Sequence, residues 1–330
     1  MTAWITALTD AFARLEQALF EGLVQPLLFH LGLGNVLEDA FEATGWLLVG
    51  LLQIALLLAV VGPLERWRPV EPVRDRRAVR LDILYTLIHR LGLFRVAVFF
   101  LLEPLWNLLA AQARLQGWPT WQLDQMVAPL WPGVTDSALA SFLLYLLVFD
   151  LADYLIHRAQ HRFDWWWALH AVHHGQRQMT MWSDNRNHLL DDLIRASLMA
   201  LLARAIGVEP GQFVALVAAS KLLESLSHAN LRLDFGRWGR WLLVSPHFHR
   251  LHHAALLDAP PRPSGTPHSH NYAVLFPLWD GLFGTARHDL PLQPTGIRDQ
   301  WPEHGGRDYG QGFWAQQWRG LARMVGWRGV

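Results

Sequence analysis

Five histidines lie within the eighteen residues from His157 to His174. They form one HxxxH pair, which ends at His161, and one HxxHH triplet, which begins at His170 and includes His173. Side chains three or four residues apart lie on one face of a helix, so each group can direct its imidazoles toward a common point. Imidazole is the commonest metal ligand among side chains. This stretch therefore predicts a metal site around which the rest of the chain must fold.

The segment between the two groups, FDWWWAL at 163–169, sets a geometric condition. His161 and His170 are nine residues apart, which places them about half a revolution out of phase on a continuous helix. The five imidazoles converge only if this segment breaks or bends the helix. We therefore expect a break, and one straight helix over 150–174 would exclude a single site.

A second HxxHH triplet, in SPHFHRLHH at 245–253, adds His249, His252 and His253. Eight imidazoles exceed the four ligands that a zinc ion usually takes, and they suit two six-coordinate metal ions with open positions. We infer a dinuclear site. The chain has no cysteine, so the ligands must be nitrogen and oxygen atoms, and iron, copper, nickel and zinc all remain candidates at this point.

Two carboxylates, Asp150 and Asp153, precede the first histidine pair on the same expected helix. Asp153 stands one turn before His157, and Asp150 shares a helical stripe with His157 and His161. A carboxylate in such a position can accept the second N–H of a ligand imidazole and fix its tautomer. We expect this supporting role for both aspartates.

Two apolar runs of about equal length, 193–206 and 213–226, are separated by a short segment that contains proline and glycine. They are short for membrane spans and suit a part-embedded hairpin. Antiparallel packing of the two arms would bring His188, just before the first run, near His228, just after the second. We expect these two histidines to be further ligands or close neighbours of the ligands.

The composition, with 52% hydrophobic and 17% charged residues, favours a membrane protein. Residues 46–62 carry no charge and would span roughly 25 Å as a helix. The arginines of the next segment, 66–80, place it as a loop on the cytoplasmic side. Segments 83–105 and 138–156 are expected to re-enter the membrane, which puts His157 on the same cytoplasmic face.

These features predict an all-α fold: an integral membrane helical bundle with a histidine-rich metal site on its cytoplasmic side. We expect an amphipathic N-terminal helix region at 1–45 and transmembrane helices and loops at 46–136. A catalytic domain at 137–286 and an interfacial C-terminal tail at 287–330 follow. The expected location is the inner membrane.

Several short motifs occur in order along residues 140–286. They are DLADYLIHRAQH at 150–161, LHAVHH at 169–174, RNHLLD at 186–191, SHAN at 227–230, SPHFHRLHH at 245–253, NY at 271–272 and LWDGLFGT at 278–285. This series resembles the fatty acid hydroxylase/sterol desaturase superfamily, whose members are membrane-bound non-haem di-iron oxygenases. The sequence departs from many members at His270, where they have aspartate, and at Ala273, where they have glycine.

The resemblance implies a set of site residues. The implied metal ligands are His157, His161, His170, His173, His174, His249, His252 and His253, with His188 and His228 as further ligands or close neighbours. Asn230 also matches a family position and, with Asp150 and Asp153, is expected among the catalytic residues. It further implies two iron ions as the cofactor, with zinc as a substitute in the isolated protein, and O2 and a lipid as substrates. The reaction would be hydroxylation or desaturation of a sterol-like, fatty acyl or related lipid.

The electrons for such a reaction must come from another protein. The chain has no GxGxxG fingerprint in a strand-helix setting and no cysteine motif for haem or an iron-sulfur cluster. A ferredoxin or a cytochrome with its reductase is the expected partner. No basic tract accompanies exposed aromatic residues, so we expect no nucleic-acid partner.

Two other functions compete with an oxygenase. A zinc pair could hydrolyse an ester or phosphodiester, although HExxH is absent and carboxylate ligands are few. A non-catalytic membrane protein could hold a metal or haem through paired histidines, although haem needs axial pairs on facing helices and the two triplets put more imidazoles together than such pairs use.

Overall fold

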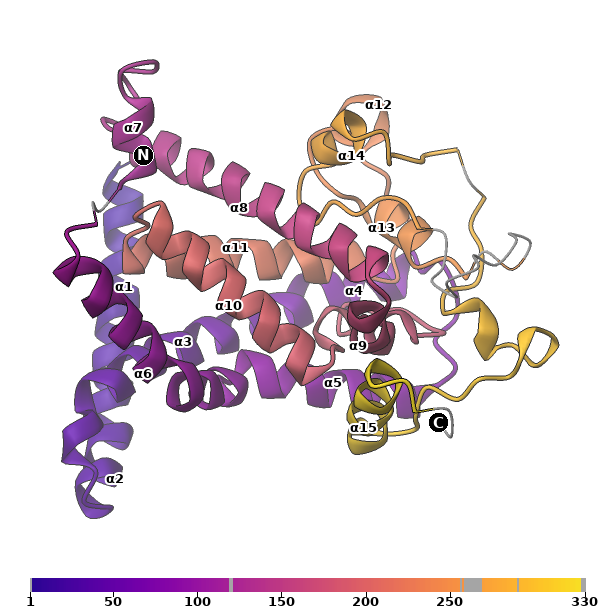
Figure 1. The fold of residues 1–330 in the computed structure, drawn as a ribbon, viewed down its shortest axis with the longest axis horizontal. Helices are drawn as coiled ribbons and strands as arrows, with labels where there is room; N and C mark the ends of the chain where they lie inside the picture. Colours follow the sequence, from indigo (N-terminus) through magenta and orange to yellow (C-terminus); the bar gives the residue numbers. More distant parts are fainter. Residues whose placement is uncertain (1, 119–120, 256, 258–268, 290, 328–330) are drawn as a thin grey trace. The chain divides into compact units, whose positions relative to one another are not determined.

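The computed structural model describes residues 2–118, 121–255, 257, 269–289 and 291–327. The longer helices are α1 (Thr2–Leu19), α3 (Leu37–Leu56), α5 (Arg76–Arg90), α6 (Leu93–Leu115), α8 (Ala138–Arg162), α9 (Asp164–His174), α10 (Leu189–Ala205), α11 (Pro210–His228) and α15 (Phe313–Met324). Short helices are α2 (Gln25–His30), α4 (Gly62–Trp67), α7 (Leu123–Val127), α12 (Gly236–Gly239), α13 (Pro246–His252) and α14 (Leu278–Leu282). The all-α prediction is confirmed for the described residues (Figure 1).

The chain divides into two compact units, one of Met1–Leu56 with Leu87–Leu109 and the other of Leu57–Thr86 with Ala110–Val330. In the first unit, the side chain of Gln53 in α3 accepts a hydrogen bond of 2.5 Å from the buried guanidinium of Arg90. The two chain segments approach so closely that a Cβ on Gly50 would lie 1.7 Å from the Arg90 carbonyl oxygen. Glycine at position 50 therefore permits this polar contact.

Two helices are long and apolar enough to cross a membrane, among the residues that could be assessed: Gly34–Trp67, which contains α3 and α4, and Ala138–Arg162, which is α8. Only 33% and 39% of their most apolar stretches are buried. Leu51 and Leu58 are 44% and 54% exposed. Most of the residues in these two stretches are therefore not buried within the protein.

Some predicted boundaries differ from the structure. Residues 83–105 are not one span, because α5 ends at Arg90 and Gly92, with a left-handed φ of 81°, turns the chain before α6 begins. The predicted loop at 66–80 is already helical from Arg76 onward.

The break predicted between the histidine groups is confirmed. Helix α8 ends at Arg162, Phe163 adopts an extended conformation with φ −99° and ψ 121°, and α9 begins at Asp164. The Phe163 carbonyl accepts the first backbone N–H groups of α9, from Trp166 and Trp167. One extended residue therefore redirects the chain and gives the two histidine groups separate helices.

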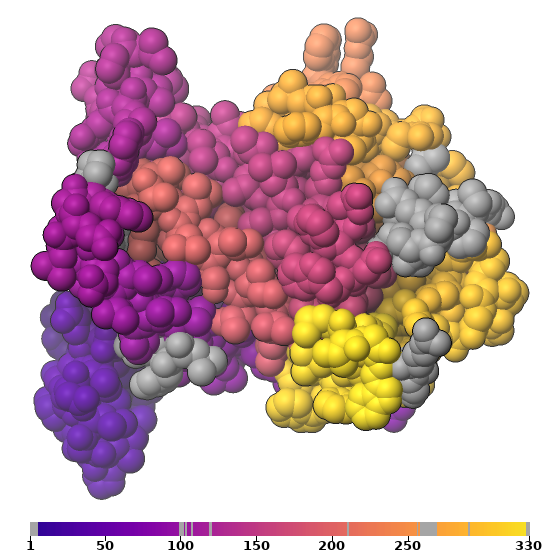
Figure 2. Space-filling model, in the orientation of Figure 1, coloured from indigo at the N-terminus to yellow at the C-terminus, as the bar shows by residue number. Residues whose placement is uncertain are grey.

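The second unit holds the histidines between α8, α9, α11 and α13. The predicted hairpin arms are α10 and α11, and the guanidinium of Arg195 in α10 joins Asp153 of α8 to Glu224 of α11, at 2.8 Å and 3.0 Å. Helix α15 packs on α9, and the space-filling view shows it at the surface in yellow (Figure 2).

The close approach at Gly50 gives a stability prediction. Gly50→Ala should lower the free energy of unfolding by roughly 1–3 kcal/mol, because the added Cβ must displace the backbone at Arg90. Thermal unfolding in detergent micelles measures the effect. Gly22→Ala is the matched control, since nothing lies within 4 Å of a Cβ at that position. Equal melting temperatures for the two variants would contradict this packing.

Candidate metal centre

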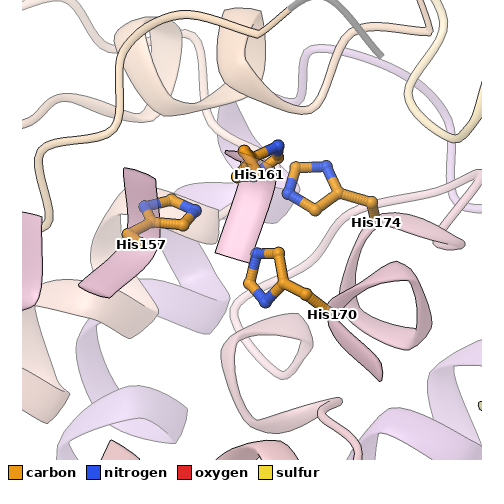
Figure 3. Close-up of side chains that lie close together, drawn as sticks. All are labelled: His157, His161, His170 and His174. Atoms are coloured by element: carbon orange, nitrogen blue, oxygen red, sulfur yellow. The ribbon is translucent and has the colours of Figure 1, made fainter. Parts of the chain in front are cut away.

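The first group of convergent histidines joins the pair to part of the first triplet. His157 and His161 come from α8, and His170 and His174 come from α9. One nitrogen of each ring lies within 4.8 Å of those of the others, and all four side chains are buried. Figure 3 shows the four rings around a common space. The break at Phe163 is what lets one short stretch of chain supply all four.

The second group draws on three helices: His173 from α9, His228 from α11, and His249 with His253 from the end of α13. The Nε2 atom of His228 lies 3.2 Å from that of His173 and 3.0 Å from that of His249. The Nε2 atoms of His249 and His253 are 3.1 Å apart. His228 thus lies within this group, and its role as a metal ligand stays a prediction.

A third set, His174, His252 and His253, connects the two groups. The Nε2 atoms of His252 and His174 are 3.1 Å apart, and the rings of His174 and His253 stack with centroids separated by 4.3 Å. The two groups are therefore adjacent. The two groups and the third set together contain nine of the ten histidines expected at the site.

Hydrogen bonds to Nδ1 fix the orientation of several rings. The acceptors are the backbone carbonyls of Tyr272 for His157 at 2.8 Å, of Glu224 for His228 at 2.8 Å and of His270 for His252 at 2.7 Å. A neutral imidazole that donates from Nδ1 has a lone pair on Nε2. These rings therefore present Nε2 lone pairs to the group, which is how metal ligands are held.

The carboxylate of Asp191 holds His170. Its Oδ2 lies 3.1 Å from the Nδ1 atom of His170, and its Oδ1 accepts hydrogen bonds from the side chains of Gln160 and Trp166. Burial would raise the pKa of Asp191, but the hydrogen bond and charge interaction with His170, together with the other two donors, hold that pKa below its usual value. Asp191 is thus ionised and favours an N–H on Nδ1 of His170.

Five histidines of the centre outside α8 are kept neutral. Burial, followed by repulsion from neighbouring imidazoles, lowers the pKa well below its usual value at His173, His174, His249, His252 and His253. A metal ligand must be unprotonated. These residues are therefore in the protonation state that coordination needs.

The residues present fit metal ions. Among the described residues, the Nε2 atoms of His157 and His170 and both ring nitrogens of His161 are buried without a hydrogen-bond partner. An unpaired buried polar atom costs roughly 1–3 kcal/mol, which a coordinated ion would remove. Neighbouring ligands at metal–nitrogen distances of about 2.1 Å are roughly 3.0 Å apart in octahedral and roughly 3.4 Å apart in tetrahedral geometry. The observed separations of 3.0–3.2 Å are compatible with ligands of a common ion.

His188 lies apart from both groups. Its Nε2 donates to the backbone carbonyl of Gln317 in α15 at 2.8 Å, and its Nδ1 accepts from the backbone N–H of Leu190 at 3.1 Å, capping α10. Both ring nitrogens are engaged, so the expected role as a ligand does not agree with the structure. The start of α10 does lie beside the ligands, since Asp191 contacts His170, but His188 points toward α15 instead. The hairpin in the sequence could not show to which side His188 points.

Asp150 and Asp153 also have partners other than the ligands. Asp150 accepts hydrogen bonds from the backbone of Leu275 and Phe276, at 2.8 Å and 2.9 Å, and from the indole of Trp279 at 3.0 Å. Asp153 pairs with Arg195. Neither accepts the second N–H of His157, so the expectation of direct support is corrected. Asp150 instead anchors the segment that carries the Tyr272 carbonyl.

Asn230 is a structural residue in this geometry. Its side-chain oxygen accepts from the backbone N–H groups of Val70 and Glu71, both at 3.1 Å, and its amide donates to the Glu71 carbonyl at 2.7 Å. These three bonds fasten the loop after α4 next to the end of α11. A catalytic role for Asn230 does not agree with these contacts.

The sequence reasoning missed Asp191 and the three carbonyl acceptors. Asp191 could have been found, because it ends the RNHLLD motif and is a carboxylate near a histidine cluster. The carbonyls of Tyr272, His270 and Glu224 belong to backbone that every residue has. No sequence signal identifies them.

Comparison with known proteins agrees with this site. The fatty acid hydroxylase family model matches residues 142–285, which contain both histidine groups. Through this region the chain is similar to the fatty acid hydroxylase/sterol desaturase superfamily. No solved structure matches the chain.

Two characterised kinds of relative were found. Ornithine lipid hydroxylase OlsE of Rhizobium tropici is 24% identical over 72% of this chain and 66% of its own length. Alkylglycerol monooxygenase of Caenorhabditis elegans is 27% identical over 43% of this chain and 26% of its own length, and that of Danio rerio is 28% identical over 46% and 31%. The chain thus spans just under two thirds of the first relative and no more than about a third of the other two.

The contact between Asp191 and His170 predicts a change in metal affinity. Asp191→Asn should weaken iron binding by roughly 10–100-fold, because the amide no longer favours an N–H on Nδ1 of His170. Titration of the metal-free protein with Fe²⁺ under argon measures this. Asp289→Asn, at an exposed carboxylate paired with Arg287, should bind as the wild type does. An unchanged affinity in Asp191→Asn would show that the contact does not support a ligand.

The different positions of His188 and His228 allow a matched pair of substitutions. His228→Gln should lose one bound metal ion per chain, because its Nε2 lies in the second group. His188→Gln should retain the wild-type metal content, since both its nitrogens bond to backbone. Elemental analysis of the purified proteins measures the content. Loss of metal in His188→Gln alone would reverse the assignment.

Proposed function

We propose that the protein is a membrane-bound lipid hydroxylase whose nine-histidine centre holds two iron ions. The observation that carries the proposal is the pair of adjacent groups of four buried imidazoles, with a third histidine set joining them. Iron held there would supply the redox chemistry with O2 that attack on an unactivated C–H bond requires and that acid-base side chains lack.

The chain's own contribution is to hold, orient and shield this centre. Asp191 and the carbonyl acceptors fix the tautomers of four rings. Trp167 covers one side, with its ring centroid 5.0 Å from that of His161 and 5.3 Å from that of His174. Burial of all nine histidines excludes bulk water from the reaction.

The geometry favours this function over a zinc hydrolase. Four histidines complete a tetrahedral zinc site and leave no position for a reacting water, whereas a six-coordinate iron ion with four nitrogen ligands keeps open positions. Asp191, the carboxylate that contacts the first group, already accepts hydrogen bonds from Gln160, Trp166 and His170 and is therefore engaged in holding a ligand.

A haem-binding function is disfavoured by distance. A porphyrin must fit between two axial imidazoles, but the neighbouring Nε2 atoms of the centre are only 3.0–3.2 Å apart. Imidazole rings at this separation leave no space for a porphyrin between them.

The surroundings of the reaction complete the proposal. The candidate spans Gly34–Trp67 and Ala138–Arg162 would hold the protein in the inner membrane with the centre on the cytoplasmic side. Electrons would come from a ferredoxin or a cytochrome with its reductase. The relatives named as hydroxylase and monooxygenase support hydroxylation rather than desaturation, and a lipid is the substrate class that suits a membrane-embedded site.

Isotopic oxygen distinguishes this function from hydrolysis. The iron-loaded protein, given membrane lipids, a chemical or ferredoxin reductant and ¹⁸O2, should produce a lipid alcohol that carries one ¹⁸O atom. Mass spectrometry of extracted lipids measures the incorporation. His173→Ala, which removes a ligand of the second group, should give no labelled product. Release of a fatty acid or phosphate without ¹⁸O2 incorporation would favour the hydrolase.

A further inference from the structure

A cavity of about 400 Å³ lies against the C-terminal turn of α8. His161 and Tyr272 form its inner wall, and Leu155, Arg158, Arg162 and Phe163 line the rest. His161 is only 2% exposed and belongs to the first histidine group. The cavity therefore connects the surface with a ligand of the candidate metal centre. Figure 2 shows α8 and α9, in pink, reaching the surface on the face drawn.

The outer wall combines two cations with apolar side chains. Arg158 and Arg162 are exposed, and Leu155 and Phe163 are 48% and 49% exposed. Among the described residues, neither guanidinium forms an ion pair with a carboxylate. Arg158 donates to the Tyr154 hydroxyl at 3.4 Å, lies 5.8 Å from the centre of the Phe283 ring and interacts electrostatically with the buried carboxylate of Asp280. This wall suits an anionic group that is attached to a hydrocarbon chain.

Helix geometry places the two arginines close to the metal ligand. Arg158 precedes His161 by three residues and Arg162 follows it directly, so both lie within about one turn, or roughly 5 Å along the helix axis. A volume of about 400 Å³ is near the lower end of ligand cavities, which run from roughly 300 to 1,000 Å³. It holds a headgroup and a few carbons, not a whole lipid.

We propose that this cavity binds the substrate of the proposed hydroxylase by an anionic headgroup, a phosphate or a carboxylate, held between Arg158 and Arg162. The first carbons of the chain then lie against Leu155 and Phe163, beside His161. The carbon that is hydroxylated is therefore only a few bonds from the headgroup. The position of the hydroxylated carbon rests on the proposed hydroxylase function, whereas the binding of the headgroup does not.

A binding experiment that needs no turnover tests the cavity. Radiolabelled dioctanoyl phosphatidic acid is dialysed to equilibrium against the metal-loaded protein in dodecyl maltoside, with no reductant present so that no turnover occurs. The wild type should bind one molecule per chain. Arg158→Gln/Arg162→Gln should bind at least tenfold more weakly, and Arg158→Lys/Arg162→Lys should recover part of the affinity. Arg74→Gln/Arg77→Gln removes the same charge from exposed positions outside the cavity and should bind as the wild type does.

Competitors identify what is recognised. Dioctanoylglycerol and inorganic phosphate should each displace the probe at least a hundredfold less well than unlabelled phosphatidic acid. If dioctanoylglycerol displaces the probe as well as unlabelled phosphatidic acid does, the cavity is a neutral lipid site. If inorganic phosphate does so, the cavity is a simple anion site. If the glutamine variant binds the probe as tightly as the wild type does, the arginines only contact the bilayer. Each of these results overturns the proposal.

The binding and ¹⁸O2 experiments together distinguish a failure of the cavity assignment from a failure of the hydroxylase proposal. If Arg-dependent binding is found but no lipid gains ¹⁸O, the hydroxylase proposal fails and the cavity assignment stands. If a hydroxylated product forms with its oxygen far along the chain, or equally fast in Arg158→Gln/Arg162→Gln, the cavity assignment fails and the hydroxylase stands. Equal metal content in wild type and variant confirms that the substitutions leave the centre intact.

Discussion

The burial of nine imidazoles in one place is the constraint on which the second unit of the structure depends. Buried nitrogens without hydrogen-bond partners, as at His157, His161 and His170, destabilise the fold in the absence of a ligand. Coordination of metal ions converts this cost into binding free energy, so folding and metal binding are coupled. The helices α8, α9, α11 and α13 must therefore hold their histidines at fixed positions relative to one another.

Much of the surrounding polar structure serves to keep those elements in place. Asp150 ties α8 to the segment whose Tyr272 carbonyl orients His157. Asn230 fastens the loop after α4 beside the end of α11, two residues from His228. His188 joins the start of α10 to α15. These residues lie close to the ligands in sequence because they position the segments that carry the ligands.

The sequence allowed the ligands to be predicted better than their supports. The HxxxH and HxxHH spacings showed that the histidines of each motif share one face of a helix. The helical phase difference between His161 and His170 required a break between them, and Phe163 makes that break. Helical spacing also suggested that Asp153 faces His157, but Arg195 from another helix takes that carboxylate. Which partner a buried carboxylate chooses depends on tertiary contacts, and the carbonyl acceptors have no side-chain signature at all. The expected single span at 83–105 is another example, because the turn at Gly92 divides this apolar segment between two helices.

The number of metal ions in the intact protein tests the central claim most directly. The protein is purified without oxygen from cells grown in iron-rich medium, and iron is measured together with protein concentration and by Mössbauer spectroscopy. Two adjacent histidine groups predict two iron ions per chain, with spectra that change when O2 is added. One ion per chain, stoichiometric zinc that no O2 exposure alters, or no metal in a folded protein would contradict the account.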